Sequence, residues 1–222
     1  MERASIWFTG NWRLGDPAAV AARPDVSSPA EMATVLIEEF NSLVEPGDIV
    51  WMLGGMFGDA QAGIEPDLDA VGLLHGRKYL IAGPGDHCWF AHPGSMTWTQ
   101  RYRDAGLAGV VTGAALARVQ QRGRTTARVG LPIRLPVGPL RTPVNLAHFP
   151  YAAQGQHGTQ VQRPVRDPKA AAQWLVHGAP PEGDPDQWGL RQFPVDVDTW
   201  EMQPVPARIV TEHITHSLED GS

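Results

Sequence analysis

The chain has 222 residues with 24 acidic and 18 basic side chains, which give a net charge of −6 at neutral pH. This acidic balance argues against a protein that binds nucleic acid mainly through its phosphates. The single cysteine, Cys88, excludes an intramolecular disulfide and a cysteine-built zinc site. The sequence has neither a signal-peptide pattern nor an apolar run long enough to span a membrane, so we expect a cytoplasmic protein without a membrane partner.

The N-terminal half of the chain alternates short strands with helices. Buried strands are predicted at residues 6–8, 49–53 and 79–82. A helix is predicted over residues 29–44, because Ser28 can cap it, Pro29 suits its first turn and apolar residues recur at helical spacing. A shorter helix is predicted over residues 68–74. This alternation is typical of an α/β protein in which loops follow the carboxyl ends of the strands.

The C-terminal half has a different character. Residues 109–147 hold valine-rich pieces separated by glycine and proline, a pattern typical of short strands in a mixed sheet. Residues 152–168 are polar and are predicted to form a surface excursion. Two further strands are predicted at 174–176 and 195–197, and a terminal helix at 206–214. Since neither a repeat nor a linker is visible, we expect one domain over residues 1–222.

Five loops follow the predicted strands, the places where sites gather in α/β folds. They span residues 9–16, 53–55, 83–87, 148–151 and 177–181. Their order, spacing and flanks resemble those of the calcineurin-like metallophosphoesterases, especially the small bacterial and phage members, over residues 5–214. The resemblance implies an α/β four-layer sandwich in which two mixed β-sheets are flanked by helices. It also points to a phage-encoded protein, in the virion or in the host cytoplasm.

The first three loops depart from the family at positions that would bind metal. The resemblance places the family's first aspartate and histidine on Asn11 and Arg13, and its bridging aspartate on Gly55. In the third loop, the asparagine ligand and the catalytic histidine fall on Pro84 and Gly85. None of these replacements preserves the family's ligand.

The same comparison leaves a few of the family's polar residues in place. Asp86 of the third loop and the histidine ligand at His148 are kept, as is the leading histidine of the fifth loop, His177, which is not a ligand. The last two histidine ligands fall on Ala179 and Pro181. We call the remaining constellation the relic pocket, and it consists of Asn11, Arg13, Gly55, Asp86, His148 and His177.

A two-metal centre needs carboxylates and a group that bridges the two ions. Gly55 cannot bridge, and the guanidinium of Arg13 stays charged. One such charge about 4 Å from a divalent ion costs about 8 kcal/mol at an effective dielectric constant of about 20. We therefore expect neither a catalytic residue, a metal nor a cofactor here. Arg13 is expected to pair with an acidic neighbour, Asp86 first and Asp16 second, or else to face solvent.

Two further histidines, His87 and His92, flank Cys88 in and after the third loop. Their spacing matches no zinc-binding pattern. We therefore expect them to be hydrogen-bonded loop residues rather than metal ligands.

The sequence thus predicts a catalytically inactive relative, a pseudoenzyme that serves as a binding, assembly or structural component with a protein partner. Trp98, Trp188 and Trp200 fall on loops or their edges and are candidate anchors for that partner, unless they only cover the core. The alternative function is a divergent phosphoesterase, or a phosphate or nucleotide binder, that uses Arg13 and His148.

Overall fold

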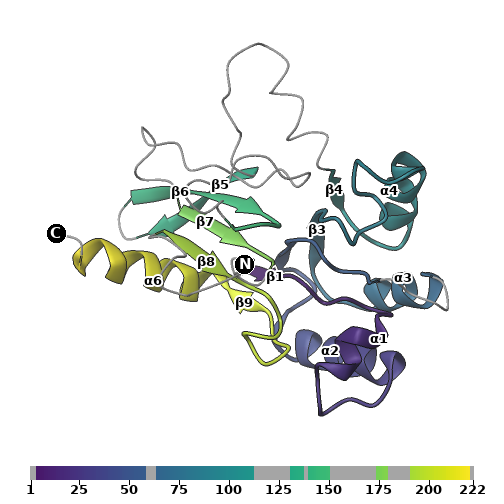
Figure 1. The fold of residues 1–222 in the computed structure, drawn as a ribbon. Coiled ribbons are helices and arrows are strands. Elements are labelled where there is room, and N and C mark those ends of the chain that lie inside the picture. Colours follow the sequence, from purple (N-terminus) through teal and green to yellow (C-terminus); the bar gives the residue numbers. More distant parts are fainter. Residues whose placement is uncertain are drawn as a thin grey trace, which may run out of the picture.

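Two mixed β-sheets face one another in the computed structural model, which describes residues 4–58, 64–112, 131–137, 140–150, 174–179 and 191–220 (Figure 1). The larger sheet contains β1 (Ile6–Thr9), β2 (Ile49–Met52), β3 (Arg77–Ile81), β4 (Gly109–Val111) and β9 (Val205–Pro206). Its strand order is β4-β3-β2-β1-β9, and only β9 runs antiparallel to its neighbour. The carboxyl ends of β1, β2 and β3 therefore lie at the same edge, and their loops converge there.

The smaller sheet contains β5 (Leu131–Val137), β6 (Leu140–Ala147), β7 (Trp174–His177) and β8 (Gln192–Pro194), in that order. β5 pairs antiparallel with β6, whereas β6, β7 and β8 are parallel. The loops after β6 and β7 carry His148 and Gly178, and both contact the loop after β2. Loops from both sheets thus meet at one end of the molecule.

Four helices cover one face of the larger sheet (Figure 1): α1 (Pro17–Ala21), α2 (Pro29–Leu43), α3 (Glu65–Gly72) and α4 (Ser95–Asp104). The longest, α2, begins where the sequence predicts, because the Ser28 hydroxyl accepts a hydrogen bond from the Glu31 N–H and Pro29 occupies the first turn. The C-terminal helix α6 (Ala207–Asp220) packs Val210 and Ile214 between the sheets.

The larger sheet separates two hydrophobic cores because successive residues of a strand point to opposite faces. Toward the helices, Val50 and Met52 of β2 are fully buried against Leu36 of α2. Toward the smaller sheet, Phe8 of β1 is buried in the same cluster as Val176 of β7. The edge where the loops meet is therefore supported from both sides.

The α/β prediction with two mixed sheets is confirmed. The fourth layer of the expected sandwich is not established, because no described helix contributes to the small cluster of Ala147 and Leu175 behind β6 and β7. The strand predicted at 195–197 is wrong: β8 ends at Pro194, and Asp196 leaves that sheet to bridge Gly10. The excursion predicted at 152–168 lies outside the described residues. The single domain stays a prediction.

No helix within the described ranges is long and apolar enough to cross a membrane.

Candidate functional site

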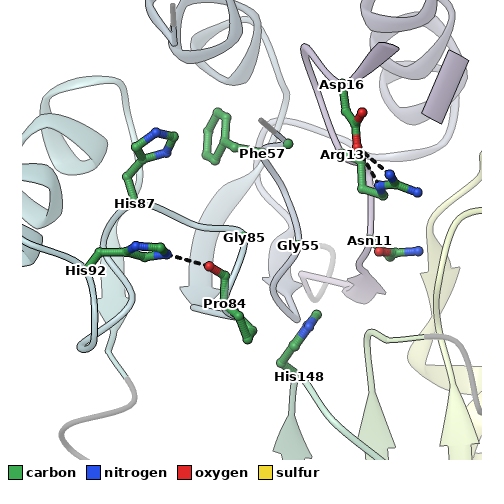
Figure 2. A pocket seen from close by; sticks show the side chains of 11 residues that line it. Asn11, Arg13, Asp16, Gly55, Phe57, Pro84, Gly85, His87, His92 and His148 are labelled. Carbon is green, nitrogen blue, oxygen red and sulfur yellow. Dashed lines mark hydrogen bonds and ion pairs between the residues drawn. The ribbon is translucent and has the colours of Figure 1, made fainter. Parts of the chain in front are cut away.

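The loops after β1, β2 and β3 and the loop after β6 surround a pocket of about 500 Å³, which we call the loop pocket (Figure 2). It is lined by Asn11, Arg13, Asp16, Gly55, Phe57, Gly58, Pro84, Gly85, His87, His92 and His148. Four of the six relic-pocket residues therefore come together as the loop order predicts. The other two, Asp86 and His177, are fully buried behind its wall.

Arg13 forms an ion pair with Asp16, three residues further along the first loop (Figure 2). Its Nε donates to Oδ2 of Asp16 at 2.9 Å, and Nη2 donates to the same oxygen. Partial burial opposes ionisation of Asp16, but the N–H of Ala18 and the guanidinium together lower the pKa of its carboxyl. The prediction that Asp86 is the first partner of Arg13 is wrong, since both carboxylate oxygens of Asp86 accept hydrogen bonds from backbone N–H groups.

Asp86 joins the second loop to the third. Its Oδ2 accepts hydrogen bonds from the N–H groups of Gly83 (2.7 Å) and Gly55 (3.0 Å), and its Oδ1 accepts from Met56 (2.9 Å) and Phe57 (3.4 Å). Burial raises the pKa of Asp86 to about 6, although each of these amide donors acts to lower it. The side chain thus shapes the wall of the loop pocket without entering it.

His148 fits into a niche that two glycines leave open. A Cβ on Gly54 would lie 2.6 Å from Nδ1 of His148, and a Cβ on Gly83 would lie 2.6 Å from its Cδ2. Nδ1 lies 2.8 Å from the carbonyl oxygen of Leu53. Because a carbonyl only accepts, Nδ1 carries the proton and Nε2 keeps its lone pair. Burial lowers the pKa of His148 to about 4, so the imidazole is neutral at pH 7.

His177 is fully buried and has the same tautomer. Its Nδ1 lies 2.8 Å from the carbonyl oxygen of Ala179, and its Nε2 has no hydrogen-bond partner in the described part of the chain. Burial lowers its pKa to about 4, and nearby His148 lowers it further. Next to it, Gly178 lies so close to the second loop that a Cβ there would stand 2.0 Å from the carbonyl oxygen of Leu53.

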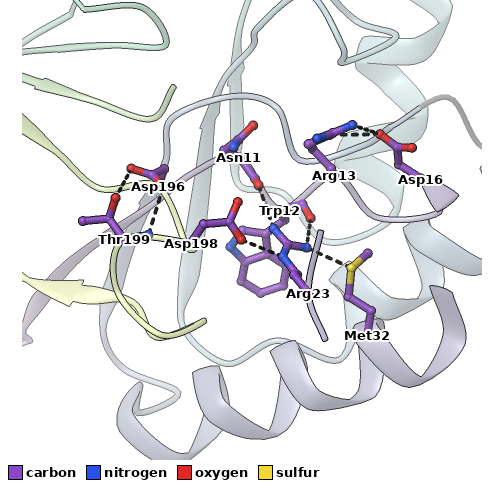
Figure 3. A network of polar contacts seen from close by, with 9 residues as sticks. All are labelled: Asn11, Trp12, Arg13, Asp16, Arg23, Met32, Asp196, Asp198 and Thr199. Carbon is purple, nitrogen blue, oxygen red and sulfur yellow. Dashed lines mark hydrogen bonds and ion pairs between the residues drawn. The ribbon is translucent and has the colours of Figure 1, made fainter. Parts of the chain in front are cut away.

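The first loop is held in an unusual backbone conformation. Asn11 and Arg13 have φ angles of 58° and 55°, a region that side-chain-bearing residues enter at a cost of about 1–3 kcal/mol. Figure 3 shows the buried guanidinium of Arg23 beneath this loop. It donates to the carbonyl oxygens of Trp12 (2.9 Å) and Asn11 (3.4 Å), and to Oδ1 of Asp198 (2.7 Å). Sequence reasoning missed Arg23.

The side chains at the loop pocket do not fit the dinuclear metal centre that the family resemblance implies. Gly55 and Pro84 offer no side-chain donor, and the guanidinium of Arg13 lies beside Asp16 on another part of the pocket wall (Figure 2). Within the described ranges, no group of three or more His, Cys, Asp or Glu side chains could hold a metal ion. The side chains of Asn11, Arg13 and Asp16 offer hydrogen-bond donors and acceptors to a ligand.

His87 and His92 form the wall opposite Arg13 (Figure 2). Nε2 of His92 lies 2.6 Å from the carbonyl oxygen of Pro84, so the prediction of a hydrogen-bonded loop histidine is confirmed there. The backbone N–H of His87 donates to the hydroxyl of Tyr102, at 3.0 Å. Its ring lies 4.7 Å from that of Trp98.

Two of the three tryptophans predicted as interface anchors, Trp98 and Trp200, pack against other residues of the chain. Trp98 is half-buried, with the guanidinium of Arg101 4.3 Å from its ring centroid. Trp200 is also half-buried, and its ring centroid lies 5.6 Å from that of Phe193 while its indole N–H donates to the carbonyl oxygen of Pro194. Trp188 lies outside the described residues. For the first two, these contacts favour the alternative that loop aromatics cover the core.

Comparison with known proteins gives a phage relative and a structural neighbour. No family model matches the sequence. The chain is 28% identical over 176 residues to Gene 66 protein of Mycobacterium phage L5, an alignment that covers 79% of this chain and 76% of that protein. The fold resembles that of the protein of unknown function AQ665 from Aquifex aeolicus, with a TM-score of 0.60 and 15% identity over 95% of this chain and 99% of the neighbour. The first similarity is consistent with a phage-related protein, and the second concerns the fold alone.

Proposed function

We propose that the chain is a catalytically inactive relative of the calcineurin-like metallophosphoesterases, with their sandwich architecture, that acts as a binding, assembly or structural component. The observation that carries this proposal is the ion pair of Arg13 with Asp16 in the wall of the loop pocket. A pair of divalent ions needs several anionic ligands in the same space, and a guanidinium beside them opposes their charge. Asp86 does not supply one, because both of its oxygens accept from backbone amides.

The partner in this proposal is another protein, in the host cytoplasm or in a virion. The similarity to a phage gene product supports a phage-related role. The net charge of −6 argues against nucleic acid as the main partner. Inactive members of enzyme families retain a fold whose surface and pockets can still bind, so loss of the catalytic ligands does not imply loss of function.

A phosphate or nucleotide binder, or a divergent phosphoesterase, is the second candidate. One observation favours it: Arg13 and His148 line the same pocket. Two others weaken it, because Asp16 neutralises the guanidinium and His148 is uncharged at neutral pH. An ionised phosphate would therefore meet little net positive charge.

Hydrolysis of bis(p-nitrophenyl) phosphate with added Mn²⁺ tests the proposal. We expect the purified protein and its His148→Ala variant to show the same background rate, since any rate they share comes from contaminants. A rate that is well above background in the native chain and disappears in His148→Ala would contradict inactivity and favour the second candidate.

A further inference from the structure

The charged side chains at the loop pocket sum to about zero, or to a negative charge when Asp86 is ionised. Among the described residues that line it, Arg13 is the one permanently charged cation, and Asp16 neutralises it. Burial in the glycine niche keeps His148 neutral at pH 7 by lowering its pKa, although its hydrogen bond to the carbonyl oxygen of Leu53 acts to raise that pKa. Directly behind the wall, the carboxyl of Asp86 contributes negative potential whenever it is ionised. An anion entering this pocket gains little from Coulomb attraction.

Donors and acceptors stand side by side in the same pocket. The guanidinium of Arg13 offers N–H donors, the amide of Asn11 offers a donor and an acceptor, and the carboxylate of Asp16 offers acceptors. Nε2 of His148 is a further acceptor, because Nδ1 carries the proton. The phosphate group of a monoester such as AMP is mainly a dianion at neutral pH and has only acceptor oxygens, so it would place lone pairs against those of Asp16 and His148. A hydroxyl group can donate and accept, and therefore suits both kinds of partner.

The opposite wall offers flat, weakly polar surface. The rings of Pro84 and His92 line this side, and the hydrogen bond between Nε2 of His92 and the carbonyl oxygen of Pro84 fixes the histidine ring (Figure 2). The side chain of Phe57 adds little surface, because it is buried against Tyr102. A volume of about 500 Å³ lies in the range of pockets that enclose small organic ligands. One polar wall and one flat apolar wall match a ring whose edge carries hydroxyl groups and whose faces carry C–H groups.

We propose that the loop pocket binds a neutral, polyhydroxylated ring compound, a sugar of one or two rings, and holds it without cleaving it. Asn11, Arg13 and Asp16 form hydrogen bonds with the hydroxyl groups on one edge of the sugar. Nε2 of His148 accepts a hydrogen bond from another of its hydroxyl groups. This inference goes beyond the proposed function. The two proposals can fail independently, because sugar binding is measured by NMR whereas catalytic inactivity is tested by hydrolysis and by Mn²⁺ binding.

Ligand-observed NMR on the full chain tests it. The probes are glucose, galactose, arabinose, N-acetylglucosamine and trehalose at millimolar concentration, with inorganic phosphate and AMP as the anionic arm. We expect at least one neutral sugar to bind and both anions to bind more weakly than that sugar. Tighter binding of phosphate or AMP than of every sugar would overturn the inference and favour the second candidate function. Binding of no probe at all would also overturn it.

Two substitutions place the binding in the pocket. Asn11→Gly removes the amide and suits the positive φ at that position, so the fold is retained, and we expect about tenfold weaker sugar binding from the lost hydrogen bonds. Glu38→Gln, on the exposed face of α2, is the matched control and should bind as the native chain does. If Asn11→Gly binds the sugar with unchanged affinity, the site lies elsewhere and the inference is wrong.

Discussion

The buried guanidinium of Arg23 donates to Oδ1 of Asp198 at 2.7 Å, and the two residues are 175 positions apart in the sequence. The Arg23 side chain is 4% exposed, whereas that of Asp198 is 51% exposed. The same guanidinium holds the carbonyl of Trp12 in the first loop. The conformation of the loop pocket therefore depends on the turn that precedes the C-terminal helix.

Replacing Arg23 with alanine should destabilise the fold by about 3 kcal/mol, because it removes a buried ion-pair partner and leaves two loop carbonyls without their donor. Urea unfolding measures the effect. Arg101→Ala is the control, since its pair with Glu65 is exposed on both sides and should be worth less than about 1 kcal/mol. Equal losses in the two variants would mean that Arg23 is not a structural clamp.

The four amide donors around Asp86 lead to a second prediction. Asp86→Asn places an NH₂ group against backbone N–H groups, so at least one buried donor loses its acceptor, and we expect a loss of about 2 kcal/mol in unfolding free energy. Thermal melting of the variant beside Asp25→Asn, an exposed carboxyl, checks this. If the two variants have the same melting temperature, contacts other than those of Asp86 hold the second and third loops together.

The niche of His148 can be tested with matched glycine substitutions. Gly83→Ala would put a Cβ 2.6 Å from Cδ2 of the imidazole, so the ring must leave its bond to Leu53. We expect a stability loss above about 1 kcal/mol, as for other overpacked sites, together with a shift of the His148 ring signals in NMR. Gly47→Ala meets no atom within 4 Å and should be nearly neutral. An unshifted His148 signal in Gly83→Ala would contradict the described niche.

Stability should fall as the pH is lowered from 7 to 5. The pKa values of His148 and His177 are lowered from 6.5 to about 4, so between these values the unfolded chain binds more protons than the folded chain, and acid favours unfolding. Asp86 acts in the opposite direction, because its pKa is raised from 3.8 to about 6 and the folded chain takes up its proton first. Two histidines outweigh one carboxyl, and we expect a net loss of about 2 kcal/mol.

Urea unfolding at pH 7 and pH 5 measures this difference. The variant His148→Gln removes one of the titrating groups and should reduce the difference between the two pH values. A chain that is equally stable or more stable at pH 5 would show that Asp86 dominates, or that the histidines are hydrated.

Sequence reasoning placed the loops better than it placed the contacts between them. Parallel strands deliver their loops to one edge of a sheet, which brings Asn11, Arg13 and Gly55 together, whereas His148 reaches the same pocket from β6 of the smaller sheet. Two residues of the relic pocket, Asp86 and His177, carry the right chemistry at the right loops but are turned inward. A motif position does not reveal which way its side chain points.

The partner of Arg13 shows the same limit. Asp86 is the acidic residue that the family pattern retains, but backbone amides satisfy it, and the nearer Asp16 forms the pair. Arg23 was missed because nothing local marks it as buried: its carboxylate partner lies near the other end of the chain.

Binding of Mn²⁺ is the measurement that bears most directly on catalytic inactivity. The purified chain is dialysed against Mn²⁺, its metal content is determined by elemental analysis, and its melting temperature is compared with and without the ion. An inactive pocket walled by Arg13 and Asp16 predicts less than one bound ion per chain and an unchanged melting temperature, because only an ion that binds the folded state stabilises it. Two bound ions per chain, with a higher melting temperature, would contradict the proposed function.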